Sequence, residues 1–238
     1  MQNFSLLRII RYSAIALIIA LSLVMAGVFI YQNGAEKQGD VIAGIEMGTH
    51  FSIINVKTGE KVDESAFQGR PQALYFGFTH CPDVCPTTLI DMESWINALG
   101  EEAETIHFAM ISIDPERDNA SLLSHYLENF HPSLQGYTGS LEEIEKMRLS
   151  YRIHAEKIFD DENDPDNYTM DHTASVLLLN AKSQFIGTIA YQEDPKAAIA
   201  KLKRLLSNHR AMHEKVDSGF SQKAERKQKL IAYHADIH

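Results

Sequence analysis

The segment ALYFGFTHCPDVCPTT, residues 73–88, holds both cysteines of the chain and decides the predicted fold. Its first six residues are apolar and aromatic, which predicts a buried β-strand. From Val84 onward, apolar residues recur at helical spacing, which predicts a helix to Leu99 with one buried face. That face is formed by Leu89, Met92, Ile96 and Leu99. A buried strand that leads directly into a helix is typical of an α/β sheet.

The patterns on either side of this segment complete an α/β assignment. Alternating apolar runs around Thr58-Gly59 predict a β-hairpin, and the acidic residues 155–170 show no clear periodicity and are interpreted as a long loop. The predicted elements are, in order, the hairpin of 50–56 and 61–62, the strand and helix above, a strand at 105–113, helices at 119–130 and 140–153, strands at 174–179 and 184–191, and a helix at 195–206. This order predicts an α/β, thioredoxin-like fold with an N-terminal β-hairpin extension.

An uncharged run of 19 residues, Ser13–Tyr31, precedes the predicted fold. It is long enough to cross a bilayer as one helix. Arg8 and Arg11 precede it, and basic residues before a first span tend to stay in the cytoplasm. A cleaved signal peptide is the alternative, but its apolar core is usually shorter and ends in a small-residue cleavage site. The end of this run lacks such a site, so we expect a single transmembrane anchor.

These patterns predict a single-pass inner-membrane protein with its N-terminus in the cytoplasm and its C-terminal domain in the periplasm. The predicted parts are a cytoplasmic stub and transmembrane anchor at 1–31, a linker at 32–47, the thioredoxin-like domain at 48–206 and a polar, basic tail at 207–238. Residues 32–200 carry 28 acidic and 11 basic residues. Because nucleic-acid binding depends on neutralising phosphates, this balance argues against a nucleic-acid partner.

Cys81 and Cys85 are the only cysteines, and they lie where the predicted helix begins. A helix N-terminus presents unpaired N–H groups and a partial positive charge, which stabilise a thiolate and lower the pKa of a cysteine. The spacing is C-x3-C, whereas disulfide oxidoreductases of this fold normally use C-x-x-C. Soft thiolates favour Cu(I). The pair therefore indicates a metal site.

His172 is the candidate third ligand, because it directly precedes the strand predicted at 174–179. In a thioredoxin-like fold this segment lies beside the helix that carries the cysteines. Oxidoreductases usually have a proline at this place, and this chain has a histidine. An imidazole beside two thiolates gives a three-coordinate site that suits Cu(I) and Cu(II). His80 and Asp171 are predicted to lie next to the ligands without binding the metal themselves. Asp171 either orients His172 through a hydrogen bond or faces a partner.

The motif FGFTHCPDVCPTTL, together with Asp171-His172-Thr173, resembles the Sco family, also called SenC or PrrC. Members are copper metallochaperones for the dinuclear copper centre of cytochrome c oxidase. The resemblance covers roughly residues 40–206. It implies copper bound by Cys81, Cys85 and His172 and delivered to the copper-centre subunit of the oxidase. It also implies exchange with other periplasmic copper chaperones, and a metallochaperone rather than a turnover enzyme.

Other functions remain open on the sequence. A membrane-anchored thiol–disulfide oxidoreductase that reduces the cysteines of the oxidase copper site needs Cys81 and Cys85 but not His172. A redox or copper sensor needs the same ligands with a different output. Two further histidine pairs, His209/His213 and His234/His238, are spaced four apart. They are interpreted as part of a solvated tail, with a weak accessory metal site as the alternative.

Overall fold

The computed structural model describes residues 12, 17, 19, 21–26, 44–159, 164 and 167–214. It divides into two units, residues 1–43 and 44–238. The described residues of the first unit before residue 27 are helical. Most of the predicted anchor and linker, and the tail beyond residue 214, lie outside the described residues. Across the part of the chain that is described, no helix combines the length and apolar character that a membrane span requires.

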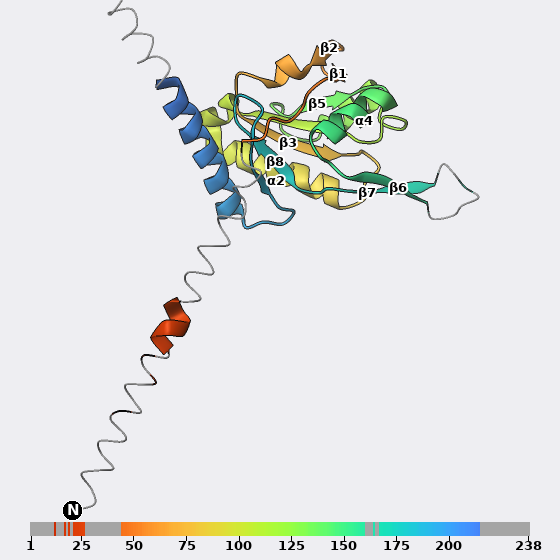
Figure 1. The fold of residues 1–238 in the computed structure, drawn as a ribbon. Coiled ribbons are helices and arrows are strands. Elements are labelled where there is room, and N and C mark those ends of the chain that lie inside the picture. Colours follow the sequence, from red (N-terminus) through yellow and green to blue (C-terminus); the bar gives the residue numbers. More distant parts are fainter. Residues whose placement is uncertain are drawn as a thin grey trace, which may run out of the picture. The chain divides into compact units, whose positions relative to one another are not determined.

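The second unit is built on a seven-stranded mixed sheet with the strand order β2-β1-β5-β4-β3-β8-β9 (Figure 1). The strands are β1 (Ser52–Asn55), β2 (Lys61–Asp63), β3 (Gln72–Gly77), β4 (His107–Ser112), β5 (Gln135–Thr138), β8 (Val176–Leu179) and β9 (Phe185–Ile189). Strands β3, β4 and β5 are parallel, and the outer pairs are antiparallel. Every residue of β3 and β4 is buried, as expected of central strands covered on both faces.

The helices are α2 (Val84–Leu99), α3 (Ala120–Leu127), α4 (Leu141–Ser150) and a helix over residues 195–214. Short 3-10 turns cover Glu64–Phe67 and Gly100–Thr105. The predicted cap of α4 is present, because the Ser140 side chain accepts a hydrogen bond from the Glu143 N–H. The last helix continues through residue 214, beyond its predicted end at 206.

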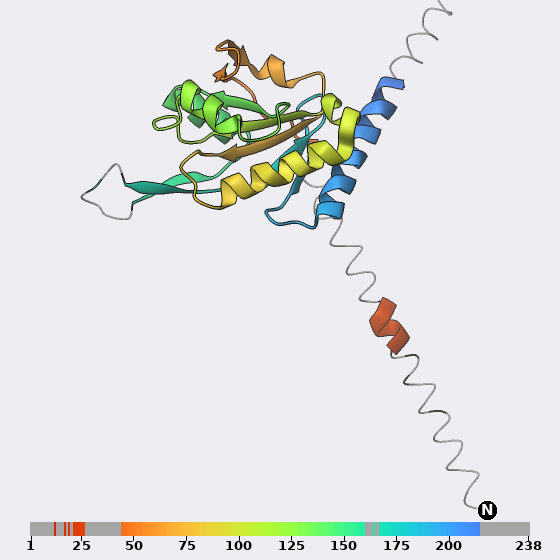
Figure 2. The same ribbon diagram turned by 180° about the vertical axis from the view of Figure 1, so that it is seen from behind.

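The side chains of β3 point alternately to the two faces of the sheet, and α2 covers the face that is turned to the viewer in Figure 2. Tyr75 contacts Cys85 in α2, whereas Phe76 packs against Tyr151 at the end of α4, with ring centroids 5.4 Å apart. Successive strand residues point to opposite faces, so α2 and α4 cover opposite sides of the sheet. The predicted apolar face of α2 is buried throughout, at Leu89, Met92, Ile96 and Leu99.

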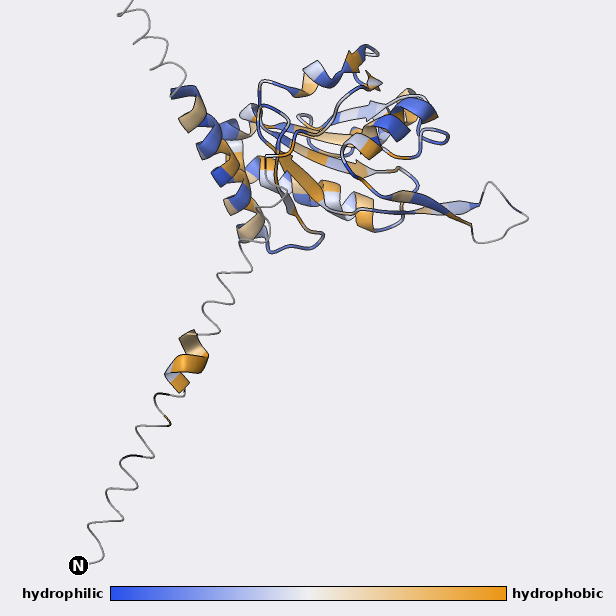
Figure 3. Cartoon of the chain, in the orientation of Figure 1, coloured by the Kyte–Doolittle hydropathy of each residue, from blue (hydrophilic) through white to orange (hydrophobic). Residues whose placement is uncertain are grey.

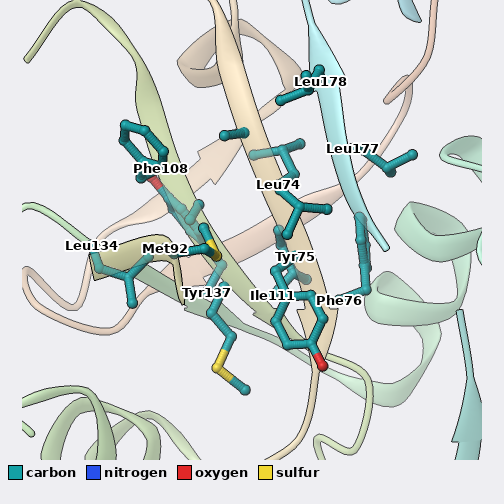
Figure 4. Close-up of a cluster of buried hydrophobic side chains, with 14 of the residues drawn as sticks. Leu74, Tyr75, Phe76, Met92, Phe108, Ile111, Leu134, Tyr137, Leu177 and Leu178 are labelled. Atoms are coloured by element: carbon teal, nitrogen blue, oxygen red, sulfur yellow. The ribbon is translucent and has the colours of Figure 1, made fainter. Parts of the chain in front are cut away.

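The core lies along the central strands. Figure 3 shows hydrophobic residues concentrated there, and Figure 4 shows side chains of β3, β4 and β8 meeting in one cluster. Leu74, Phe76 and Ile111 are each fully buried. Burying one large apolar side chain contributes about 1.5–3 kcal/mol. This core fixes the ends of β3 and β4, and therefore the loops that follow them.

Strand β5 was absent from the predicted elements. It is four residues long and contains Gly136, so it lacks an apolar pattern. A Cβ at Gly136 would overlap a Leu127 side-chain carbon and lie 2.7 Å from one of Val56. The glycine therefore lets α3 and β1 approach the strand, and it removes a side chain that would have marked the strand in the sequence.

The prediction of a long loop at 155–170 is wrong. Strands β6 (Ala155–Phe159) and β7 (Tyr168–His172) form an antiparallel hairpin that extends from the body (Figure 1). Most of their residues are exposed or only partly buried. An apolar alternation marks a strand only where one face is buried, so this pair carries little signal in the sequence.

Candidate metal centre

Cys85 lies in the first turn of α2, and its side chain is fully buried against the end of β3. The Tyr75 hydroxyl donates a hydrogen bond to Cys85 Sγ at 3.2 Å. A Cβ at Gly77, the last residue of β3, would lie 3.1 Å from the same sulfur. The end of β3 therefore encloses the Cys85 thiol.

Cys81 lies one turn before Cys85 and is partly exposed. Its Sγ accepts a hydrogen bond from the backbone N–H of Cys85 at 3.3 Å. This is the interaction that the sequence predicted, because the first N–H groups of a helix have no partner within the helix. Both cysteines are free thiols in the structure. Cys81 is thus the accessible member of the pair, and Cys85 the enclosed one.

His172 is the last residue of β7, and the fold brings it to the cysteines. Its Nε2 lies 3.7 Å from Cys85 Sγ, although the two residues are 87 positions apart in the sequence. Its Nδ1 lies 3.0 Å from the Thr173 carbonyl oxygen, which accepts when Nδ1 carries the proton. Phe78 meets the imidazole edge-on, with ring centroids 5.8 Å apart. In this tautomer Nε2 presents its lone pair towards the sulfur.

Burial changes the protonation of both facing groups. It lowers the pKa of His172, which favours the neutral imidazole. It also raises the pKa of Cys85 to about 12, although the Tyr75 hydrogen bond acts in the opposite direction. The predicted lowering of the cysteine pKa is therefore wrong for Cys85, because desolvation outweighs the helix N-terminus. A cation that replaces the thiol proton would remove this penalty.

A cavity of about 250 Å³ opens beside these groups. Its lining includes Cys81, His172 and Met170. Met170 is partly buried and packs against the core, which agrees with a packing role for its thioether. The cavity gives a small ion or an incoming ligand access to one side of the site.

The distance between Cys85 and His172 suits two ligands of one ion. Donors bound at about 2.3 Å for sulfur and about 2.0 Å for nitrogen stand roughly 3.5–3.8 Å apart at tetrahedral to trigonal angles. As they lie, however, no three His, Cys, Asp or Glu side chains among the described residues are grouped closely enough to hold a metal ion. A three-coordinate site therefore needs the Cys81 side chain to turn from the helix N–H towards the other two.

A family model described as SCO1/SenC matches residues 40–207. The chain belongs to the SCO1/SenC family. The match includes both cysteines and His172 of this Sco-family chain. The Arabidopsis thaliana mitochondrial protein SCO1 homolog 1 is 37% identical over 153 residues. That alignment covers 64% of this chain and 45% of the Arabidopsis protein, so the chain spans less than half the length of this relative.

Solved Sco structures share the fold. ScoI from Bradyrhizobium japonicum with copper bound is 38% identical, with a TM-score of 0.61 over 67% of this chain and 99% of that one. Yeast Sco1 with copper bound is 28% identical, with a TM-score of 0.61 over 68% of this chain and 90% of that one. These likenesses confirm the predicted α/β, thioredoxin-like fold.

In this Sco-family chain, His80 lies beside the loop that carries the cysteines, whereas Asp171 points away from His172. His80 Nδ1 lies 3.1 Å from Thr79 Oγ1 and 3.7 Å from Asp118 Oδ1, beside the cysteine loop. The exposed Asp171 side chain lies 3.6 Å from His154 Nε2, whereas the group beside His172 Nδ1 is a backbone carbonyl. Of the two roles considered for Asp171, the structure therefore favours an outward-facing one.

A buried carboxylate that the sequence analysis missed holds the loop before Cys81. Asp118 accepts hydrogen bonds from the Thr79 N–H at 3.0 Å, the Thr79 hydroxyl at 2.5 Å and the Ser112 hydroxyl at 2.7 Å. Its side chain is fully buried. A signal was present in the sequence, because Asp114 and Asp118 closely follow an apolar strand. Buried carboxylates of this kind need several donors, so Asp118 fixes the loop.

A second missed group ties the base of β7 to the end of β4. Tyr168 donates its hydroxyl hydrogen to Asp114 at 2.8 Å. Arg117 pairs with Asp114 at 2.5 Å, donates to the Tyr168 carbonyl at 2.9 Å and lies over the Tyr168 ring. This clamp of Asp114, Arg117 and Tyr168 sets the start of the strand that ends at His172.

Proposed function

We propose that this Sco-family chain is a copper metallochaperone that binds copper through Cys81, Cys85 and His172. It would deliver that copper to the dinuclear centre of cytochrome c oxidase. The observation that carries the proposal is the approach of His172 Nε2 to Cys85 Sγ at 3.7 Å, beside a cavity that Cys81 lines. Copper bound in two Sco structures supports the choice of metal.

The ligand set suits transfer better than permanent storage. Cys85 is enclosed and His172 is held by its neighbours, whereas Cys81 is partly exposed. An incoming thiolate or imidazole can reach the ion from the cavity and displace Cys81 first. Copper then moves through shared-ligand intermediates, and the fold of the chain does not have to open.

The redox state of the cysteines would control loading. Oxidation of the two thiols to one disulfide releases two electrons and two protons and removes both thiolate ligands. We therefore expect the oxidised chain to lose Cu(I) binding, because Cu(I) prefers soft thiolate sulfur.

The predicted placement completes the proposal. An anchor at residues 13–31 would hold the domain on the periplasmic side of the inner membrane, near the copper-centre subunit of the oxidase and other periplasmic copper chaperones. Alkaline phosphatase and green fluorescent protein fused after residue 43 test this placement. Active phosphatase and dark fluorescent protein are expected, and the reverse pattern would contradict it.

Copper stoichiometry and X-ray absorption of the reduced full chain test the ligands. We expect one copper at this site with two sulfurs and one nitrogen, and loss of that nitrogen in His172→Ala. Cys85→Ser should remove copper from the site. A copper environment that is the same in His172→Ala as in the unchanged chain would contradict the proposal.

A thiol–disulfide oxidoreductase is the second candidate, favoured by the N–H that Cys85 donates to Cys81 Sγ. Such a contact stabilises an attacking thiolate. This function needs both cysteines but tolerates His172→Ala. Reduction of a disulfide-bonded oxidase peptide by His172→Ala at the rate of the unchanged chain, without copper binding by either, would make the second candidate the better one.

A further inference from the structure

The helix over residues 195–214 carries a histidine pair that the proposed copper site does not use. The sequence pattern predicts a solvated tail at His209 and His213, but both lie within this helix. Their ring centroids are 4.5 Å apart and their planes meet at 76°. Residues four apart on a helix share one face, so the helix itself brings the two imidazoles together.

The domain holds this part of the helix in place. Leu202, Leu205 and Leu206 are buried in the core. Lys201 donates to the Thr188 carbonyl of β9 at 2.9 Å, and Arg210 pairs with Glu102 at 2.5 Å. The Arg210 ion pair lies between the two histidines in sequence. The imidazoles are therefore mounted on an anchored helix rather than on a free chain end.

The pair is far from the cysteines. Glu102 lies in the turn that follows α2, whereas the cysteines lie at the start of α2. A helix of 16 residues is about 24 Å long. Figure 1 shows the last helix at the end of the domain opposite the β6–β7 hairpin. An ion held by His209 and His213 could not share ligands with the cysteine site.

The imidazoles are free to bind. Within the described residues, neither ring has an ion pair or a hydrogen bond, and Nδ1 of His209 is buried without a partner. Burial, and then the neighbouring His213, lower the pKa of His209, in keeping with a neutral ring. By contrast, His125 on helix α3 pairs with a carboxylate, its Nδ1 lying 2.9 Å from Glu128.

We propose that His209 and His213 form a second, independent metal site that binds a divalent transition-metal ion, with Cu²⁺ preferred. Imidazole nitrogen suits Cu²⁺, Ni²⁺ and Zn²⁺, and Cu²⁺ binds most tightly of these to a given nitrogen site. Among the described residues no third ligand completes the site. Water or a ligand from a partner fills the remaining positions, so the ion exchanges readily.

The test uses the full chain with Cys81→Ser, Cys85→Ser and His172→Ala, which removes the first site. We expect one Cu²⁺ equivalent with nitrogen coupling in its electron paramagnetic resonance spectrum. Replacing even an outer partner of a metal ligand costs ~10- to 100-fold in affinity, so His213→Ala should weaken binding by at least about tenfold. The matched control His125→Ala removes another exposed helical histidine and should leave the affinity unchanged.

Two results would overturn the proposal. One is unchanged Cu²⁺ affinity in His213→Ala, and the other is loss of the ion in His234→Ala/His238→Ala with His209 and His213 intact. If the triple variant fails to fold, Ni²⁺ protection of the unchanged chain from diethyl pyrocarbonate replaces it. His209 and His213 should then be protected while His125 is modified, and equal modification of all three with and without Ni²⁺ would refute the site.

Discussion

Two histidines in the same domain show opposite uses of burial. His107 begins β4 and is 1% exposed; its ring stacks on Phe67 with centroids 5.1 Å apart, and its Nε2 lies 3.0 Å from the Tyr137 hydroxyl. His172 ends β7, is only partly buried and faces the Cys85 sulfur. Burial lowers the pKa of both, and that of His107 to about 3.

The difference shows that a neutral, buried imidazole does not by itself mark a metal ligand. His107 is enclosed by aromatic rings and serves the packing of the sheet. His172 lies against aromatic rings as well, but it also lines a cavity that a cysteine shares. The structural role of His107 and the proposed ligand role of His172 therefore differ in whether an ion can reach a ring nitrogen, which at His172 is Nε2.

The largest expected effect comes from replacing each histidine with phenylalanine. His172→Phe should lower copper affinity by at least ~10- to 100-fold, because it removes a ligand. His107→Phe should leave the affinity unchanged, because its ring is remote from the cysteines. Copper competition titrations measure both. A loss of copper in His107→Phe with the fold intact would contradict the purely structural role given to His107.

The pH dependence of stability should distinguish His107→Phe from the unchanged chain. Below about pH 6.5 the unfolded chain protonates His107, whereas the folded chain does so only near pH 3. The folded state therefore loses stability as the pH falls through this window, by up to about 1.4 kcal/mol per pH unit. His107→Phe lacks this loss, so its stability relative to the unchanged chain should improve by several kcal/mol across that window.

Denaturant unfolding at several pH values between neutrality and the acid end of the window measures the change. Other titrating groups are shared by both chains and cancel in the difference. A difference in unfolding free energy that stays constant with pH would show that His107 is not kept neutral in the fold.

Tyr168→Phe should act on the clamp at the base of β7. When the Tyr168 hydroxyl is removed, the buried Asp114 loses a hydrogen-bond donor, which lowers the free energy of unfolding by about 1–3 kcal/mol. Copper affinity should fall too, because the clamp sets the strand that carries His172. Tyr126→Phe is the matched control, since the Tyr126 hydroxyl is buried without a partner among the described residues. Equal losses in the two variants would remove the positioning role.

Tyr75→Phe should have the smallest effect. It removes the hydroxyl that donates to Cys85, and that hydrogen bond lowers the pKa of the thiol. The thiolate fraction should fall by about the factor of five that corresponds to ~1 kcal/mol. In a Cys81→Ser background, the rate at which iodoacetamide alkylates Cys85 at fixed pH measures it. A faster reaction would indicate that the hydroxyl shields the sulfur instead.

Much of the fold could be predicted because its elements carry local patterns. The buried run of β3, the apolar face of α2 and the hairpin of β1 and β2 around Gly59 are all present. Strand β5 and the β6–β7 hairpin could not be predicted in the same way. The need for a glycine at position 136 becomes apparent only from its contact with Leu127 in the folded chain. The β6–β7 hairpin has no fully buried face, so its sequence shows no alternation of apolar and polar residues.

Spacing and periodicity are local properties, so the sequence alone predicts that two cysteines begin a helix after a buried strand. The sequence also predicts His172 as a third ligand, but the 3.7 Å contact with Cys85 and the raised pKa of that thiol follow only from the fold. The same is true of the contacts by which Asp118 and Arg117 hold the neighbouring segments. Desolvation and contacts between distant segments depend on which surfaces the fold brings together, and no stretch of sequence contains that information alone.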